Sequence, residues 1–312
     1  MRKAIFLFCY GVGLLSWWSI GARSWAALPE RPDRSLEVGG VDEGRASFLP
    51  WSGDWLKTRE ARAIRALHKL DLLTGKQAAA WEARAKDPNT ACEWSGYCHA
   101  WASAAVLERE PRTPLVLRGA TGRSVVLSVG DQKALLTLCH DQDEVEHFGE
   151  RYKGSAEDDR KDIYPDQMWR CLRLYVKQRG IPLILDIDSG VQVWNHPVFR
   201  YRVTHGPHTT PGLRLGRMEI WMADDAVPPD FIGTKVKKKT YQFTFRMNGK
   251  ALVMGSGRWY GASRKDHPDF AWYPTMVRPK NPHIDAAAVR RLLGPQPASL
   301  ALTLAPRGSG LY

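Results

Sequence analysis

The chain has 312 residues, of which 44% are hydrophobic and 10% aromatic, and this composition is enough to bury a substantial core. General disorder is therefore excluded as the default state. The net charge of +12 comes mostly from dispersed basic residues and has no nucleic-acid-binding motif beside it, so we expect no nucleic-acid partner.

The first 26 residues have the layout of a secretory signal peptide. Arg2 and Lys3 precede the apolar run IFLFCYGVGLLSWWSIGA, and small residues follow at Ser24 and Ala26. The run has about 18 apolar residues, which is close to the minimum length that spans a bilayer, so an uncleaved membrane anchor stays open as the alternative. We expect a secreted or periplasmic protein with no further membrane span.

Beyond this segment the chain predicts helices first and strands later. Residues 27–46 are rich in Pro, Gly and charge and predict an extended lead-in, while apolar residues at helical spacing over 57–86 predict a helical hairpin broken near Thr74-Gly75. This order is typical of an α+β fold, with one domain over 47–280 and a helix and tail over 281–312. The other expected elements are a helix from Cys98 ended by Pro111, strands at PLVLR and SVVLSV, helices over 131–139 and 165–178, and strands at IPLILDID, VQVWNHPVFRYRV, RMEIWMAD, YQFTFRM, ALVMG and RWYG.

Cys98 has the sequence context of a nucleophilic thiol. Gly96 lets the chain turn sharply just before a helix of small residues that begins at Cys98. The start of a helix stabilises a thiolate and offers backbone N–H groups to an oxyanion. A buried structural thiol or a disulfide would fit the same local pattern. Export makes a disulfide plausible, but the sequence does not pair Cys92, Cys139 and Cys171.

The segment WSGYCHAWASAAVLEREP, which contains Cys98, resembles the nucleophile segment of the transglutaminase elicitor family. The resemblance implies a papain-like or transglutaminase-like core, in which the nucleophile helix packs on an antiparallel sheet and the domain over 47–280 is catalytic. It also implies a protein-glutamine γ-glutamyltransferase, which joins a glutamine to a lysine or another amine through a cysteine thioester. Further segments resemble the family in the same order over about residues 48–275, namely FLPWSGDW, AAAWEARA, VGDQKALLT, FGERY, YPDQMW, DIDSGVQVWNHPVFRY, YQFTF and HPDFAWYP.

Two histidines lie in these family-like segments, and His267 is the preferred base. Asp266 precedes it and Asp269 follows two residues later, so a carboxylate could orient its ring as a Cys-His-Asp triad requires. We predict Asp269 as the orienting residue and Asp266 as its alternate. The alternate base is His196. The other interpretation of His196 is that it is an exposed histidine of a strand without a catalytic role.

Departures from the family pattern leave parts of the site open. A carboxylate can stand two residues before the base in that family, but Lys265 stands there in this chain. Papain-like enzymes use a glutamine six residues before the nucleophile to bind the oxyanion, and here that residue is Cys92. Trp94 and Tyr97, which flank the nucleophile, are candidates for an acyl tunnel or oxyanion contact, with ordinary packing as the alternative.

Two other functions stay open on the same residues. A cysteine peptidase or amidase would use water as the acceptor, and a catalytically inactive binding protein would keep the fold alone. We expect no metal, because the pairs Cys98-His99 and Cys139-His140 lack the ligand spacing of zinc sites. We expect no cofactor, because the sequence has no glycine-rich phosphate loop and no dinucleotide fingerprint. The expected partners are glutamine and lysine side chains of proteins or peptides.

Overall fold

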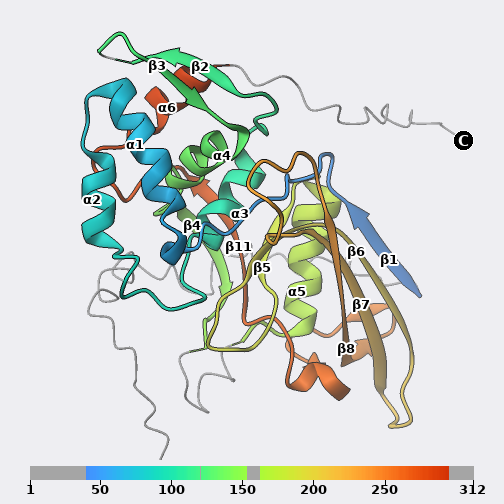
Figure 1. Cartoon of the computed structure of the whole chain (residues 1–312). Helices are drawn as coiled ribbons and strands as arrows, with labels where there is room; N and C mark the ends of the chain where they lie inside the picture. The colour runs from blue at the N-terminus through green and yellow to red at the C-terminus, as the bar shows by residue number, and fades with distance from the viewer. Residues whose placement is uncertain (1–39, 120, 153–161, 295–312) are drawn as a thin grey trace, which may run out of the picture. The chain divides into compact units, whose positions relative to one another are not determined.

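The computed structural model describes residues 40–119, 121–152 and 162–294, and Figure 1 shows their arrangement. The predicted signal peptide, most of the lead-in and the end of the tail lie outside the described residues. The elements in chain order are β1 (Val41–Arg45), the 3-10 turn η2 (Thr58–Glu60), α1 (Arg62–Thr74), α2 (Ala78–Ala85), α3 (Cys98–Leu107), β2 (Leu115–Arg118), β3 (Ser124–Leu127), α4 (Val129–Leu138), β4 (Glu144–Gly149), α5 (Pro165–Leu172), the π-helical turn η4 (Arg173–Gln178), β5 (Leu183–Asp186), β6 (Asn195–Pro207), β7 (Leu213–Ala223), β8 (Val236–Asn248), β9 (Ala251–Leu252), β10 (Arg258–Trp259), the 3-10 turn η5 (Gly261–Arg264), β11 (Phe270–Met276) and α6 (Ala286–Leu293).

Helices α1 and α2 form the predicted hairpin. Leu67 and Leu70 recur at helical spacing on the buried face of α1, and the helix ends where Gly75 adopts a φ of +70°, a conformation that glycine reaches without steric cost. The carboxylate of Asp71 accepts hydrogen bonds from the backbone N–H groups of Ala78 and Ala79 and so caps the start of α2. The break predicted at Thr74-Gly75 is confirmed.

The helix α3 is buried along almost its whole length. Four alanines, Ala100, Ala102, Ala104 and Ala105, are each at most 2% exposed, and their small side chains let α3 lie close to α4 and β6. The helix ends at Leu107, four residues before the proline predicted to terminate it. Figure 1 shows α3 beside α4, at the end of the sheet where β5 and β11 lie.

The main sheet is antiparallel, with the strand order β10-β8-β7-β6-β5-β11-β4 and with β1 paired to β6. Side chains alternate between its faces, so Leu183 and Leu185 pack with α5 on one face while Ile184 packs with α3 and α4 on the other. Trp169 from α5 is fully buried against the first of these faces. The result is a mixed α/β fold built on an antiparallel sheet.

Several predicted elements shift by a few residues. Helix α4 begins at Val129 rather than 131, because Ser128 and Asp131 form a reciprocal capping box. Strand β1 lies within the segment expected as an extended lead-in and pairs with β6. Within the part of the chain that the structure describes, no helix has the length and apolar character needed to cross a membrane.

Candidate active site

The start of α3 is fixed by a close backbone approach. The N–H of Tyr97 donates to the carbonyl of Trp55 at 2.7 Å. A Cβ at Gly96 would lie 2.5 Å from Trp55 Cδ1 and 2.6 Å from its carbonyl oxygen, so only glycine fits there. Cys98 therefore occupies the first residue of the helix, as predicted from Gly96.

The half-buried thiol of Cys98 faces the start of β6. Its Sγ lies 3.4 Å from the carbonyl oxygen of Val193 and 3.6 Å from Nδ2 of Asn195. The indole N–H of Trp272 donates to Oδ1 of Asn195 at 2.7 Å, which fixes the amide so that its NH₂ group faces the sulfur. Asn195 thus offers an oriented N–H donor at the nucleophile.

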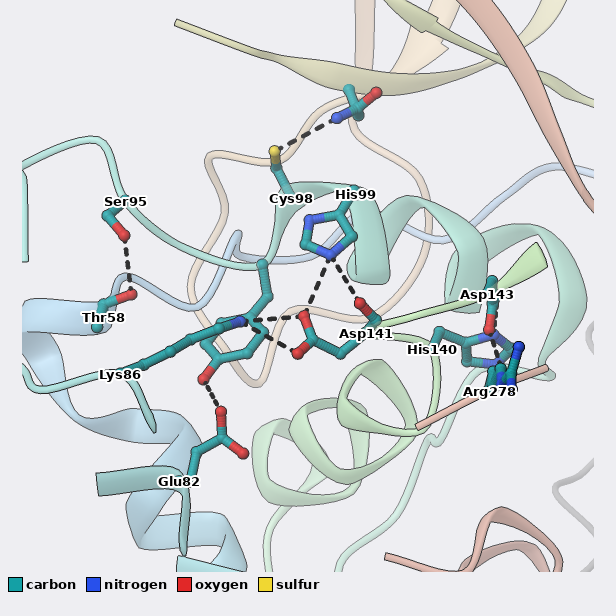
Figure 2. A network of polar contacts seen from close by, with 12 residues as sticks. Thr58, Glu82, Lys86, Ser95, Cys98, His99, His140, Asp141, Asp143 and Arg278 are labelled. Atoms are coloured by element: carbon teal, nitrogen blue, oxygen red, sulfur yellow. Dashed lines mark hydrogen bonds and ion pairs between the residues drawn. The ribbon is translucent and has the colours of Figure 1, made fainter. Parts of the chain in front are cut away.

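His99, the next residue of α3, connects Cys98 to a buried carboxylate. Its ring is hydrogen-bonded to the Cys98 thiol, and its Nε2 lies 3.1 Å from Oδ1 of Asp141. Figure 2 shows the ring between Cys98 and Asp141. On the other side of the carboxylate, Lys86 Nζ lies 3.0 and 3.2 Å from the two Asp141 oxygens. The His99 side chain is 27% exposed, so the ring is accessible from solvent.

The charges of this chain of groups alternate and stabilise one another. Burial raises the pKa of the Cys98 thiol, but the His99 hydrogen bond and charge, with Asn195, bring the net pKa below its ordinary value. Burial lowers the pKa of His99, whereas Asp141 and Cys98 raise it to about 9. Burial also raises the pKa of Asp141, but Lys86 and His99 lower it to about 2. These directions favour the thiolate and imidazolium forms over the neutral thiol and imidazole.

The remaining buried thiols have the opposite character. Burial raises the pKa of Cys171 to about 12 and that of Cys139 well above its ordinary value. Cys98 forms no disulfide bond in the described part of the chain. Its environment is therefore that of a reactive thiol, whereas Cys139 and Cys171 act as small apolar groups.

A second polar cluster holds the chain beside Asp141. Nδ1 of His140 lies 2.7 Å from Asp143, and its Nε2 lies 3.1 Å from Glu108 at the end of α3. Arg290 of α6 also binds Glu108, with its Nε 2.8 Å from the carboxylate. Because His140 precedes Asp141 directly, these contacts anchor the orienting carboxylate to α3 and α6.

Tyr97 and Trp94, the predicted tunnel or oxyanion candidates, differ in placement. The Tyr97 hydroxyl is buried and donates to Glu82 at 2.5 Å, and Lys86 Nζ lies 3.5 Å above its ring. Asn281 donates to the other oxygen of Glu82 at 3.0 Å. The Tyr97 hydroxyl is therefore committed to support of the helix start, while Trp94 is half-buried.

The structure does not join His267 and Asp269 into a pair. The Nδ1 of His267 lies 2.9 Å from the Ser263 carbonyl oxygen, its Nε2 lies 2.9 Å from Oδ2 of Asp162, and its ring stacks on Trp259. Asp269 instead accepts the Tyr152 N–H at 2.9 Å. None of these contacts is with Cys98, and both ring nitrogens of His267 are engaged, so His99 rather than His267 is the histidine beside the thiol.

The two alternates are also engaged elsewhere. His196 is fully buried rather than exposed on its strand, its Nδ1 lies 2.9 Å from the Ala223 carbonyl oxygen, and burial lowers its pKa. Its ring meets the edge of Trp101 within the core. Asp266 forms an ion pair with Lys239 at 2.5 Å.

The comparisons with known proteins concern the family and the fold. The model of the family described as "Transglutaminase elicitor" matches residues 71–214, which confirms the predicted resemblance to that family. The matched range contains Cys98, His99, Asp141 and Asn195, whereas His267 lies beyond it. A search of the curated proteins gives no match.

A solved structure shows the same fold over most of the chain. The crystal structure of the GP42 transglutaminase from Phytophthora sojae superposes with a TM-score of 0.64 and 18% sequence identity, over 82% of this chain and 91% of that one. The chain therefore has a transglutaminase-like fold.

Proposed function

We propose that the protein is a glutamine γ-glutamyltransferase that acts through a thioester on Cys98. The observation that carries the proposal is the Cys98, His99 and Asp141 series at the start of α3, with Asn195 Nδ2 at 3.6 Å from the sulfur. The family match over 71–214 and the transglutaminase-like fold support it. We also infer that α3 on the antiparallel sheet is a papain-like core.

In the first half-reaction the Cys98 thiolate attacks the carbon of a glutamine carboxamide. The oxygen of the resulting tetrahedral intermediate receives N–H groups from Asn195 and from the backbone at the start of α3. The His99 imidazolium gives its proton to the departing nitrogen, the C–N bond breaks and ammonia leaves. Cys98 then carries the acyl group as a thioester.

In the second half-reaction an amine replaces the sulfur. Neutral His99 takes a proton from the amine as its nitrogen attacks the thioester carbon, and the C–S bond breaks to restore the thiolate. Asp141 stabilises the imidazolium that this step regenerates, since its carboxylate lies 3.1 Å from Nε2. Each turnover thus releases ammonia and joins the glutamine acyl group to the acceptor amine through a new amide bond.

Amine transfer requires protection of the thioester from water. Trp55 contacts Gly96 before the nucleophile, and Trp194 follows the Val193 carbonyl that contacts Sγ. The two indole rings meet edge to face with centroids 5.4 Å apart. We infer that this aromatic pair limits the access of water to the thioester and thereby favours an amine acceptor over hydrolysis.

The proposed substrates are protein glutamine and lysine side chains outside the cell. The predicted signal peptide over residues 1–26 directs the chain to export, after which the mature protein meets extracellular or periplasmic proteins. The domain over 47–280 carries the reaction.

The test compares amine transfer with hydrolysis. Purified protein is incubated with casein and a fluorescent primary amine, and ammonia release is measured with and without the amine. We expect amine incorporation that is lost in Cys98→Ala and His99→Gln but kept in His267→Gln. Ammonia release without amine incorporation would assign an amidase, and no reaction with a range of glutamine proteins would favour the inactive binding protein.

A further inference from the structure

A row of basic side chains crosses one face of the long strands. In the pairing register Arg45 of β1 lies opposite Arg200 of β6, Arg200 lies opposite Trp221 of β7, and Trp221 lies opposite Lys238 of β8. Figure 1 shows these strands side by side. Adjacent strands are about 4.8 Å apart, so the row is roughly 15 Å long. We call Arg45, Arg200 and Lys238, together with the Trp221 ring between the last two, the basic row.

The positive charge of the basic row is incompletely compensated. Arg45 and Arg200 have no ion pair with any described carboxylate, although like charges directly opposite each other destabilise a strand pair. The Arg200 guanidinium lies 4.5 Å above the Trp221 ring and Lys238 Nζ lies 4.8 Å from it. Only Lys238 has an acidic partner, Glu219, at 2.6 Å.

The next row along the strands is balanced, which sets the basic row apart. Arg202 lies opposite both Glu43 and Glu219, and its Nε is 3.9 Å from the Glu43 carboxylate. Arg217 lies 3.3 Å from Glu219. Unmet positive charge is therefore concentrated at Arg45 and Arg200, which line a hollow in the surface together with Glu43 and Gly44.

The basic row is on the same sheet face as the candidate nucleophile. Val198 and Tyr201 both pack with α5, because a register shift lies between them in β6, so Arg200 points to the face opposite α5. Asn195 is on that face too, since it contacts Cys98 of α3. Arg200 is the fifth residue after Asn195 along β6, which is a distance of roughly 17 Å at a rise of about 3.3 Å per residue.

We propose that the basic row docks an extended acidic segment of the protein substrate. Asn195–Phe199 of β6 are buried and α3 packs on this strand, so a segment bound at the thiol reaches the row around the covered stretch, over at least about five residues. The occupant is a peptide because the cations over Trp221 leave its ring unsuited to stacking on a base or sugar, and because the uncompensated charge of Arg45 and Arg200 complements acidic side chains. That the docked peptide belongs to a substrate rests on the proposed function.

Binding is tested on the full chain carrying Cys98→Ala, so that no turnover occurs. The probe is a fluorescein-labelled peptide with one glutamine followed, after about five residues, by a run of glutamates, and the reference peptide has glutamines in place of the glutamates. We expect fluorescence anisotropy to show that Arg200→Glu weakens the acidic peptide about tenfold. Lys250→Glu, an exposed residue in the turn between β8 and β9 with the same charge change, is the matched control and is expected to bind like the parent.

The outcomes separate docking from general charge and from catalysis. The proposal would be overturned if Arg200→Glu bound the acidic peptide as tightly as the Cys98→Ala parent, or if Lys250→Glu weakened binding equally. Arg200-dependent binding of heparin without binding of the peptide would also overturn it. Arg45→Gln is expected to weaken binding of the peptide less than Arg200→Glu does. Thermal unfolding curves of the variants exclude a folding defect. In protein that retains the native Cys98, transfer of the acyl group from a small glutamine dipeptide to hydroxylamine should be unchanged by Arg200→Glu. Absence of that transfer beside Arg200-dependent binding would refute the proposed function and leave the docking surface in place.

Discussion

At the scale of single residues the candidate site is a series of alternating charges. In their ionised forms Lys86, Asp141, His99 and Cys98 alternate in sign. Lys86 and His99 lower the pKa of Asp141, Asp141 and Cys98 raise that of His99, and His99 lowers that of Cys98. In a low-dielectric setting such a series is worth more than the same contacts in water. The reactivity of Cys98 therefore depends on groups that never touch the sulfur.

The first prediction concerns the partner of the thiolate. In His99→Gln the cation that offsets burial is gone, so the pKa of Cys98 rises and less thiolate exists in mild acid. We expect iodoacetamide labelling of Cys98 at about pH 6 to slow by at least about tenfold. His267→Gln is the control and should label like the parent. Labelling that slows in His267→Gln but not in His99→Gln would restore His267 as the base.

The second prediction assigns Lys86 a positioning role through Asp141. Acylation that needs the His99 imidazolium is lost as pH rises through a pKa of about 9. Lys86→Gln removes a cation that opposes the imidazolium, so this alkaline limb of the pH profile should move up by about one unit. Lys86→Arg keeps the charge and should keep the limb in place. A lower rate in Lys86→Gln with an unmoved limb would mean that Lys86 only supports the fold.

At the scale of elements, the helix that presents the nucleophile depends on one close approach. The start of α3 is set by the contact of Gly96 with Trp55 and by the Tyr97 N–H bond to the Trp55 carbonyl. Because the thiol, the helix N–H groups and His99 all follow within three residues, a small displacement there moves every reacting group.

The third prediction tests this dependence. Gly96→Ala places a methyl group 2.5 Å from Trp55 Cδ1, so the helix start must shift, and we expect a loss of about 1–3 kcal/mol in unfolding free energy together with slower labelling of Cys98. Gly206→Ala in β6, where an added Cβ meets nothing within 4 Å, is the matched control. Urea unfolding and iodoacetamide labelling measure both effects. Unchanged labelling in Gly96→Ala would show that the helix start tolerates the shift.

Local patterns in the sequence predict elements and the nucleophile but not the residues that complete the site. The hairpin break at Gly75 and the helix start after Gly96 follow from backbone rules that act within a few residues. Asp141 lies 42 residues from His99 and Asn195 lies 97 residues from Cys98 in the sequence, and no local pattern gives either residue a role beside the thiol.

The prediction of His267 as the base depends on carboxylates beside it in the sequence. In the structure its carboxylate partner is Asp162, which is 105 residues away, so proximity in sequence is a weak guide to a triad. In the sequence His99 has no distinguishing feature beyond a pair with Cys98 that lacks zinc-ligand spacing. Neighbouring residues of a helix point about 100° apart, and the adjacency of Cys98 and His99 therefore gives no signal of contact.

At the scale of the whole molecule, two hydrophobic clusters lie on opposite faces of one sheet, and buried ionisable groups tie their stability to pH. Asp141, with its lowered pKa, adds stability above pH 4 that is lost as pH falls toward about 2. His99, with its raised pKa, adds stability below about 6.5 that is lost as pH rises through about 9. These two groups favour mild acid to neutral pH.

Asp269 pulls in the opposite direction to Asp141, and this gives the fourth prediction. Burial raises its pKa to about 7, with Asp162 adding to the shift, so the folded protein holds a proton that the unfolded chain has released, and stability falls as pH rises from about 4 to about 7. Asp269→Asn removes the ionisation while its amide oxygen still accepts the Tyr152 N–H. The variant should therefore match the parent at about pH 4 and exceed its unfolding free energy at about pH 8, by at most about 4 kcal/mol. Urea unfolding at both pH values measures the difference, and a variant that is less stable than the parent at the higher pH would show that the Asp269 carboxylate is compensated in the folded protein.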